Sequence, residues 1–219
     1  MKPEKVKAIL FDLDNTLYPA QCDLFSLIDV RINCYMEEIA GIAAADVDGL
    51  RRRYWRDYGA TLQGLIRHHD IDPEEYLDYV HAVDVASRLL PDPSLRELLA
   101  ETTTPCYVFT NGSRGHADRV LGTLGLADLF VDVFDIRIAG YQPKPNPDPY
   151  RQVLKVLQLE GYDCAMVEDQ PQNLKTAKAF GMTTVFVAQG CTAAESYPFV
   201  DCYLEQLLDI GELLGRWQA

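Results

Sequence analysis

The second half of the chain alternates short apolar runs with stretches of helical spacing, and this alternation restricts the possible folds most. The apolar runs fall at residues 106–110, 131–136, 165–167 and 183–187. Helix-like stretches fall around residues 114–124, 149–159 and 173–180, and Gly125 and Gly181 stand where helices commonly end. Strands that alternate with helices predict a parallel sheet covered on both faces. We therefore expect an α/β fold with a doubly wound, Rossmann-like sheet.

A first strand is predicted far from the others, in the apolar run of residues 6–10. Between it and the second strand lies a long region of helical pattern, with further helices expected over residues 51–65 and 73–90. Asp72 is a plausible helix N-cap, because Pro73 would occupy the first helical position. We expect residues 1–18 and 92–219 to form the core domain, and residues 19–91 to form an all-helical insert after the first strand.

Two carboxylates directly follow the first predicted strand, in Phe11-Asp12-Leu13-Asp14. Residues i and i+2 of an extended segment face the same way, so Asp12 and Asp14 can converge on one small site. Carboxylates this close repel each other unless a cation or a shared proton intervenes. The pair therefore predicts a divalent-metal site, a nucleophile with its proton-transfer partner, or both. An isolated D-x-D is also a common surface turn, so the interpretation depends on the rest of the chain.

Polar residues also follow the other predicted strands, where ligands bind in open parallel sheets. The second strand ends in Thr110-Asn111-Gly112, a loop before a later helix carries Lys144, and another strand ends in Glu168-Asp169. This set offers carboxylates for Mg²⁺, a hydroxyl and backbone N–H groups for phosphate oxygens, and an ammonium group against negative charge. Those are the groups that phosphoryl transfer needs. The sequence therefore predicts a small phosphorylated substrate and a bound Mg²⁺.

The charge of the chain excludes some partner classes. A net charge of -13 argues against nucleic-acid binding and against docking on anionic lipid. It leaves a small anionic substrate possible, because a metal ion and a lysine can reverse the local field. No apolar run is long enough to span a membrane, residues 1–5 lack the apolar core of a signal peptide, and no C-x-x-C pair is present. We expect a cytoplasmic protein; the sequence does not predict its oligomeric state.

The four polar segments resemble the motifs of the haloacid dehalogenase superfamily of phosphatases, in order and in spacing. The resemblance implies that Asp12 is the nucleophile and that Asp14 is the general acid and base. It also implies that Mg²⁺ is held by the Asp12 carboxylate, the Asp14 backbone carbonyl and Asp169. The transferred phosphoryl group would be bound by Thr110, the N–H groups near Asn111 and Gly112, and Lys144. The dehalogenase branch carries a different residue at the position of Asp14, so this sequence is more similar to the phosphotransferases.

Glu168-Asp169 departs from the commoner paired-aspartate form of the fourth motif. The resemblance implies that Asp169 keeps the direct metal contact, whereas Glu168, one carbon longer, reaches a metal-bound water. Asn173 lies one helical turn beyond Asp169. It has two interpretations: it orients a metal ligand, or it is a polar residue at the beginning of a helix.

The helical insert is similar in sequence to the cap of the pyrimidine 5′-nucleotidase subgroup. The similarity lies in Tyr58-Gly59, Leu62, Gly64-Leu65, Asp72-Pro73, Tyr76-Leu77 and Val80-His81. It implies nucleoside monophosphates such as UMP and CMP as substrates. Selecting a base requires flat apolar groups beside the phosphate site; the candidates are Tyr18, Tyr35, Tyr54, Trp55 and Tyr58, although aromatics at helical spacing are more often core residues. For Gly59 and Gly64 we favour close crossing of two helices.

Three alternatives stay open at this point. A phosphatase with the same chemistry could act on another small phosphate, such as phosphoglycolate or a sugar phosphate. Only the insert decides between these substrates. A phosphomutase would also carry both Asp12 and Asp14, so the sequence separates it poorly from a hydrolase. A non-catalytic phosphate-binding scaffold would lack a catalytic residue, and none of Asp12, Asp14, Lys144 and Asp169 is missing.

Overall fold

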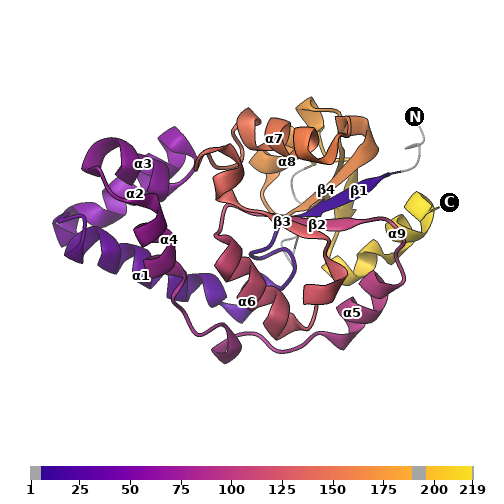
Figure 1. The fold of residues 1–219 in the computed structure, drawn as a ribbon, viewed down its shortest axis with the longest axis horizontal. Helices are drawn as coiled ribbons and strands as arrows, with labels where there is room; N and C mark the ends of the chain where they lie inside the picture. Colours follow the sequence, from indigo (N-terminus) through magenta and orange to yellow (C-terminus); the bar gives the residue numbers. More distant parts are fainter. Residues whose placement is uncertain (1–5, 189–195, 219) are drawn as a thin grey trace.

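The described residues of the computed structural model, 6–188 and 196–218, form a parallel sheet flanked by helices (Figure 1). Residues 1–5, on which the signal-peptide expectation rests, lie outside them. The sheet has six strands in the order β3-β2-β1-β4-β5-β6, and all neighbouring strands pair in parallel. The predicted fold class is confirmed. The strands are β1 (Ala8–Phe11), β2 (Cys106–Phe109), β3 (Asp132–Phe134), β4 (Cys164–Glu168), β5 (Thr183–Val187) and β6 (Cys202–Leu204).

Alternate side chains of β1 supply the cores on the two faces of the sheet. Ile9 and Phe11 belong to one buried apolar cluster, whereas Ala8 and Leu10 belong to another. Figure 1 shows α7 and α8 on one face of the sheet and α5, α6 and α9 on the other. A strand buried on both faces explains why this run is continuously apolar. These helices are α5 (Pro93–Ala100), α6 (Arg114–Leu124), α7 (Pro147–Leu157), α8 (Pro171–Ala179) and α9 (Gly211–Gln218).

Strand β1 lies at the point where the strand order reverses. The chain runs from β1 to β2 and β3 on one side, and then crosses to β4 on the other. Phe11 pairs with Val108 of β2 and with Val167 of β4. The residues that follow these strands therefore meet at one edge of the sheet, and ligands bind at such a switch point in doubly wound folds.

The helical insert lies beyond this edge of the sheet (Figure 1). Its helices are α1 (Leu24–Glu38), α2 (Ala44–Tyr58), α3 (Thr61–His69) and α4 (Pro73–His81). They enclose an apolar cluster of their own that includes Ile28, Tyr35, Tyr54, Leu65 and Tyr76. Short 3₁₀ turns connect the larger elements of the chain, at Ala20–Cys22, Val85–Ser87, Ala127–Leu129, Ile136–Ala139, Gly161–Asp163 and Leu207–Ile210.

Two predicted helices of the insert are wrong in extent. The helix expected over residues 51–65 is broken at Gly59, which adopts φ +84° and caps α2, before α3 begins at Thr61. Glycine adopts this left-handed conformation without a Cβ clash, so it ends helices readily. The helix expected over residues 73–90 ends at His81, because Asp84 caps a separate 3₁₀ turn through the N–H of Ser87. The predicted N-cap is confirmed: the Asp72 carboxylate accepts the N–H of Glu74 at 2.8 Å.

The two glycines of the insert differ in their surroundings. A Cβ atom on Gly64 would lie 2.0 Å from Cγ of Tyr54, so α2 and α3 approach closely only because residue 64 is glycine. That prediction is confirmed for Gly64. Gly59 instead faces Pro143 and the carbonyl of Lys144, next to the carboxyl ends of the strands. Within residues 6–188 and 196–218, no helix combines the length and the apolar character needed to cross a bilayer.

Candidate active site

A buried ammonium group lies at the centre of the site. Nζ of Lys144 donates to Oδ1 of Asp12 at 2.7 Å and to Oε2 of Glu168 at 2.8 Å. It also donates to the carbonyl of Phe109 at 2.6 Å, so each of its three N–H groups has an acceptor. Burial alone would lower the pKa of Lys144, but the two carboxylates outweigh burial and raise it. Lys144 therefore stays charged although its side chain is 1% exposed.

Three carboxylates surround this ammonium and exceed it in charge. Asp12, Glu168 and Asp169 each offer an oxygen, and these oxygens all lie within 4.8 Å of one another. Burial raises the pKa of Asp12, and repulsion by Glu168 raises it further. One lysine thus leaves negative charge uncompensated. A set of carboxylate oxygens fits a small hard cation such as Mg²⁺.

The two residues of the Glu168-Asp169 pair are bound differently. Oε2 of Glu168 accepts hydrogen bonds from Lys144 and from Nδ2 of Asn173 at 3.0 Å, and Oε1 accepts the N–H of Gln170 at 3.1 Å. Both oxygens of Glu168 are therefore taken up by protein donors. Asp169 accepts the side-chain amide of Gln170 at 2.8 Å and a long contact from Thr16 at 3.5 Å. Asp169 has the greater capacity left for a metal ion.

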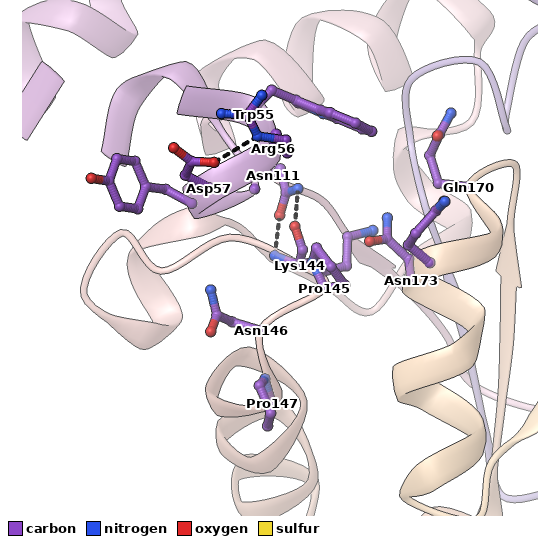
Figure 2. A pocket seen from close by; sticks show the side chains of 13 residues that line it. Trp55, Arg56, Asp57, Asn111, Lys144, Pro145, Asn146, Pro147, Gln170 and Asn173 are labelled. Atoms are coloured by element: carbon purple, nitrogen blue, oxygen red, sulfur yellow. Dashed lines mark hydrogen bonds and ion pairs between the residues drawn. The ribbon is translucent and has the colours of Figure 1, made fainter. Parts of the chain in front are cut away.

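The loop after β2 positions the lysine. The N–H of Lys144 donates to Oδ1 of Asn111 at 2.7 Å, and Nδ2 of Asn111 donates to the carbonyl of Lys144 at 3.0 Å (Figure 2). The Asn111 side chain thus binds both polar groups of the Lys144 backbone. Thr110 Oγ1 accepts the N–H of Gly112 at 2.9 Å, which closes the loop on itself. Sequence reasoning placed these residues at the site without assigning this role to Asn111.

Asp14 has different hydrogen-bond partners from Asp12 and Glu168, the two carboxylates that contact Lys144. Its Oδ1 accepts the hydroxyl of Tyr18 at 2.6 Å and lies 2.8 Å from Nε2 of His116. Burial alone would raise the pKa of Asp14, but His116 and Tyr18 outweigh burial and lower it. Sequence reasoning missed His116. The sequence held no signal for it, since His116 is a polar residue in the first turn of α6 and such residues are ordinarily exposed.

Two adjoining cavities open at these side chains. One, of about 430 Å³, is lined by Asp12, Asp14 and Asp169 together with residues of α1, α2 and α4. The other, of about 440 Å³, is lined by Trp55, Asn146 and Gln170, among others. Figure 2 shows Trp55 on one side of this second cavity and Gln170 and Asn173 on the other. Both cavities share Trp55, Gly59, Asn111, Gln170 and Asn173 in their linings.

Two of the aromatic candidates for base binding line these cavities. Trp55 borders both and is 59% exposed, and Tyr58 borders the second. Tyr35 and Tyr54 are buried in the apolar cluster of the insert. Tyr18 is buried against the core, where its hydroxyl binds Asp14.

Known proteins are similar to this chain in sequence. The chain is 32% identical over 203 residues to phosphoglycolate phosphatase of Rhodospirillum rubrum, which covers 84% of this chain and 80% of that protein. It is 28% identical over 193 residues to Phosphate metabolism protein 8 of Saccharomyces cerevisiae. That match covers 80% of this chain but spans only 60% of the yeast protein.

Solved structures agree with this relationship at the level of the fold. The crystal structure of HAD phosphatase from Thermococcus onnurineus superimposes with a TM-score of 0.66 at 21% identity, over 98% of this chain and 100% of that one. Residues 6–181 match the family described as haloacid dehalogenase-like hydrolase. The chain belongs to the haloacid dehalogenase-like hydrolase family.

Proposed function

We propose that the protein is a Mg²⁺-dependent phosphomonoester hydrolase that acts through an aspartyl-phosphate on Asp12. The observation that carries this proposal is the buried contact of Lys144 with Asp12 and Glu168, beside a further carboxylate on Asp169. Asp12, Asp169 and the backbone carbonyl of Asp14 would hold the ion. When bound, Mg²⁺ supplies positive charge that offsets the charge of the phosphoryl group.

The reaction needs two displacements at phosphorus. In the first, a carboxylate oxygen of Asp12 forms a bond to phosphorus while the bond to the ester oxygen breaks, and Asp14 donates a proton to that oxygen. In the second, Asp14 takes a proton from water as the water oxygen attacks phosphorus. The bond between phosphorus and Asp12 then breaks, which releases phosphate and restores both aspartates. In this proposal, Lys144 and the Thr110–Gly112 loop would bind the phosphoryl oxygens.

We further propose a nucleoside monophosphate, with a pyrimidine base, as the substrate class. Two adjoining cavities of about 430 and 440 Å³ offer much more room than a phosphate group occupies. Trp55 offers an exposed flat face, and Asn146 and Gln170 offer amides that can bind the edge of a base. The similarity of the insert to the pyrimidine 5′-nucleotidase cap points the same way.

A second candidate substrate is favoured by the relatives. The R. rubrum protein is a phosphoglycolate phosphatase, and glyceraldehyde 3-phosphate phosphatase of Methanocaldococcus jannaschii is 28% identical over 199 residues. Both names indicate phosphates smaller than a nucleotide. Such a substrate would leave the cavity beside Trp55 largely unfilled.

Phosphate release with Mg²⁺ separates these substrates. The panel comprises UMP, CMP, dTMP, AMP, GMP, phosphoglycolate and glucose 6-phosphate, with Asp12→Asn as the blank. We expect preference for the pyrimidine monophosphates, and we expect Trp55→Ala to raise their KM while leaving that of phosphoglycolate unchanged. Preference for phosphoglycolate would overturn the proposed substrate class but not the proposed chemistry. No phosphate release from the folded protein would overturn the hydrolase.

A further inference from the structure

The carboxylate of Asp14 is held through one of its two oxygens. The hydroxyl of Tyr18 and Nε2 of His116 both bind Oδ1, at 2.6 and 2.8 Å. Oδ2 makes no hydrogen bond within the described part of the chain, and a Cβ atom on Gly112 would lie 3.7 Å from it. Asp14 and Gly112 both line the cavity of about 430 Å³. Oδ2 is thus the oxygen left for the reaction.

The surroundings of His116 determine which ring nitrogen carries its proton. The ring is fully buried, and Nδ1 has no hydrogen-bond partner among the described residues. A buried N–H without an acceptor is costly, whereas Nε2 faces a carboxylate oxygen. The proton therefore belongs on Nε2, and His116 donates to Asp14.

The helical insert fixes the orientation of the His116 ring. His81, the last residue of α4, stacks on His116 with ring centroids 4.6 Å apart and an interplanar angle of 15°. Nδ1 of His81 lies 3.0 Å from Oγ of Ser113, which also accepts the N–H of His116. Arg119 donates to the His81 carbonyl at 2.8 Å. With these contacts the imidazole cannot rotate away from Asp14.

We propose that His116 and Tyr18 are positioning residues that fix the Asp14 carboxylate through Oδ1, so that Oδ2 exchanges the proton with the leaving oxygen. This inference rests on the proposed function, which makes Asp14 the general acid. The terminal torsion of an aspartate has a broad energy minimum, so an unanchored carboxylate turns easily. Proton transfer needs a geometry held to within about 0.5 Å, and two donors on one oxygen provide it.

The test compares kcat/KM for two classes of ester. p-Nitrophenyl phosphate has a leaving group that departs without protonation, whereas an alkyl phosphomonoester needs an acid. The alkyl ester is the member of the panel above that wild-type protein hydrolyses fastest. Because kcat/KM reports the steps up to formation of the aspartyl-phosphate, slower hydrolysis of that intermediate does not disturb the comparison.

We expect His116→Leu to lower kcat/KM for the alkyl ester about 10- to 100-fold, and that for p-nitrophenyl phosphate less than about threefold. His116→Gln retains a donor at Nε2 and should recover part of the loss. Tyr18→Phe removes only the hydroxyl and should act in the same direction. Tyr35→Phe is the matched control, because the buried hydroxyl of Tyr35 has no partner among the described residues.

Equal losses on both esters, or no loss in His116→Leu and Tyr18→Phe, would overturn the inference. If circular dichroism shows that His116→Leu is unfolded, Tyr18→Phe provides the test, because this substitution removes only one oxygen atom. Asp14→Asn distinguishes failure of the proposed general acid from failure of the positioning role. If Asp14→Asn affects both esters equally, the general-acid role in the proposed function is wrong. If it selectively impairs the alkyl ester while the other variants do not, only the positioning role is wrong.

Discussion

Nζ of Lys144 lies 2.7 Å from Oδ1 of Asp12, although 132 residues separate them in the chain. The contact depends on Asn111, which binds both the N–H and the carbonyl of Lys144. Asn111, directly after β2, therefore fixes the backbone of this lysine, whereas its ammonium group is bound from three strands, by Asp12 after β1, Phe109 of β2 and Glu168 of β4. The importance of this arrangement can be tested without substituting Lys144 or Asp12.

Asn111→Ala removes both hydrogen bonds to the Lys144 backbone. We expect kcat/KM for phosphomonoesters to fall by roughly 10- to 100-fold, because a small displacement of the ammonium misplaces it relative to phosphorus. Thr176→Ala is the matched control, since Thr176 binds the carbonyl of Pro145 on the same loop, at 2.8 Å. Steady-state kinetics of the two variants would check this. Wild-type activity in Asn111→Ala would show that Lys144 needs no such support.

Asp169→Ala should weaken Mg²⁺ binding by at least about tenfold, because Asp169 belongs to the carboxylate cluster and accepts fewer hydrogen bonds than Glu168. Calorimetric titration with Mg²⁺ in the absence of substrate measures the affinity directly. Asp148→Ala, which removes an exposed carboxylate paired with Arg151, serves as the control. An unchanged titration would assign the metal contact to Glu168 instead.

His81 should make the protein less stable in acid. Burial lowers the pKa of His81 to about 3, and the neighbouring His116 contributes. Below the unfolded-state pKa of about 6.5, the unfolded chain binds a proton that the folded protein does not, so unfolding becomes easier as pH falls from about 6.5 towards 3. At pH 5 the effect is about 2 kcal/mol relative to pH 8.

Urea unfolding of wild-type protein and His81→Asn at a series of pH values tests this dependence. Asparagine keeps an amide near Ser113 and does not titrate, so we expect the variant to lose less stability than wild type between pH 7 and pH 5. Parallel curves for the two proteins would mean that His81 is not the titrating group.

Gly64→Ala should destabilise the protein by about 1–3 kcal/mol, because its Cβ would lie 2.0 Å from the ring of Tyr54. Gly49→Ala, on α2, is the control: a Cβ there meets no atom within 4 Å, so this change should be neutral or stabilising by about 0.5–1 kcal/mol. Thermal unfolding of both variants measures the difference. Equal stability of the two would contradict the close packing of α2 and α3.

Features with a strong local signal could be predicted from the sequence. The helix predicted over residues 114–124 has those bounds, since Ser113 caps it and Gly125 ends it in a left-handed conformation. The strand predicted at residues 183–187 is also correct. Strand β6 was not predicted, because it has three residues and Tyr203 within it is exposed. The break at Gly59 was missed because the apolar spacing continues across it at Leu62 and Leu65.

The polar residues at the ends of the strands were predictable as a group, since parallel strands bring their carboxyl ends to one edge. Their mutual contacts were not. The bond of His116 to Asp14 joins residues 102 positions apart and depends on the register between β1 and β2. A polar residue one turn into a helix is ordinarily exposed, so the pattern gave His116 no distinction. Asn111 likewise binds the backbone of Lys144, which lies beside it only in the folded protein.

The most direct test of the account is to locate the phosphoryl group on the enzyme. Asp14→Asn should still transfer phosphate from p-nitrophenyl phosphate to Asp12, because that leaving group needs no acid, but should hydrolyse the aspartyl-phosphate slowly. Tandem mass spectrometry of the protein quenched with Mg²⁺ and substrate then identifies the modified residue. We predict one phosphoryl group on the peptide that contains Asp12, and none when Asp12 is also changed to Asn. Phosphorylation of another residue, or turnover that persists in the double variant, would contradict the account.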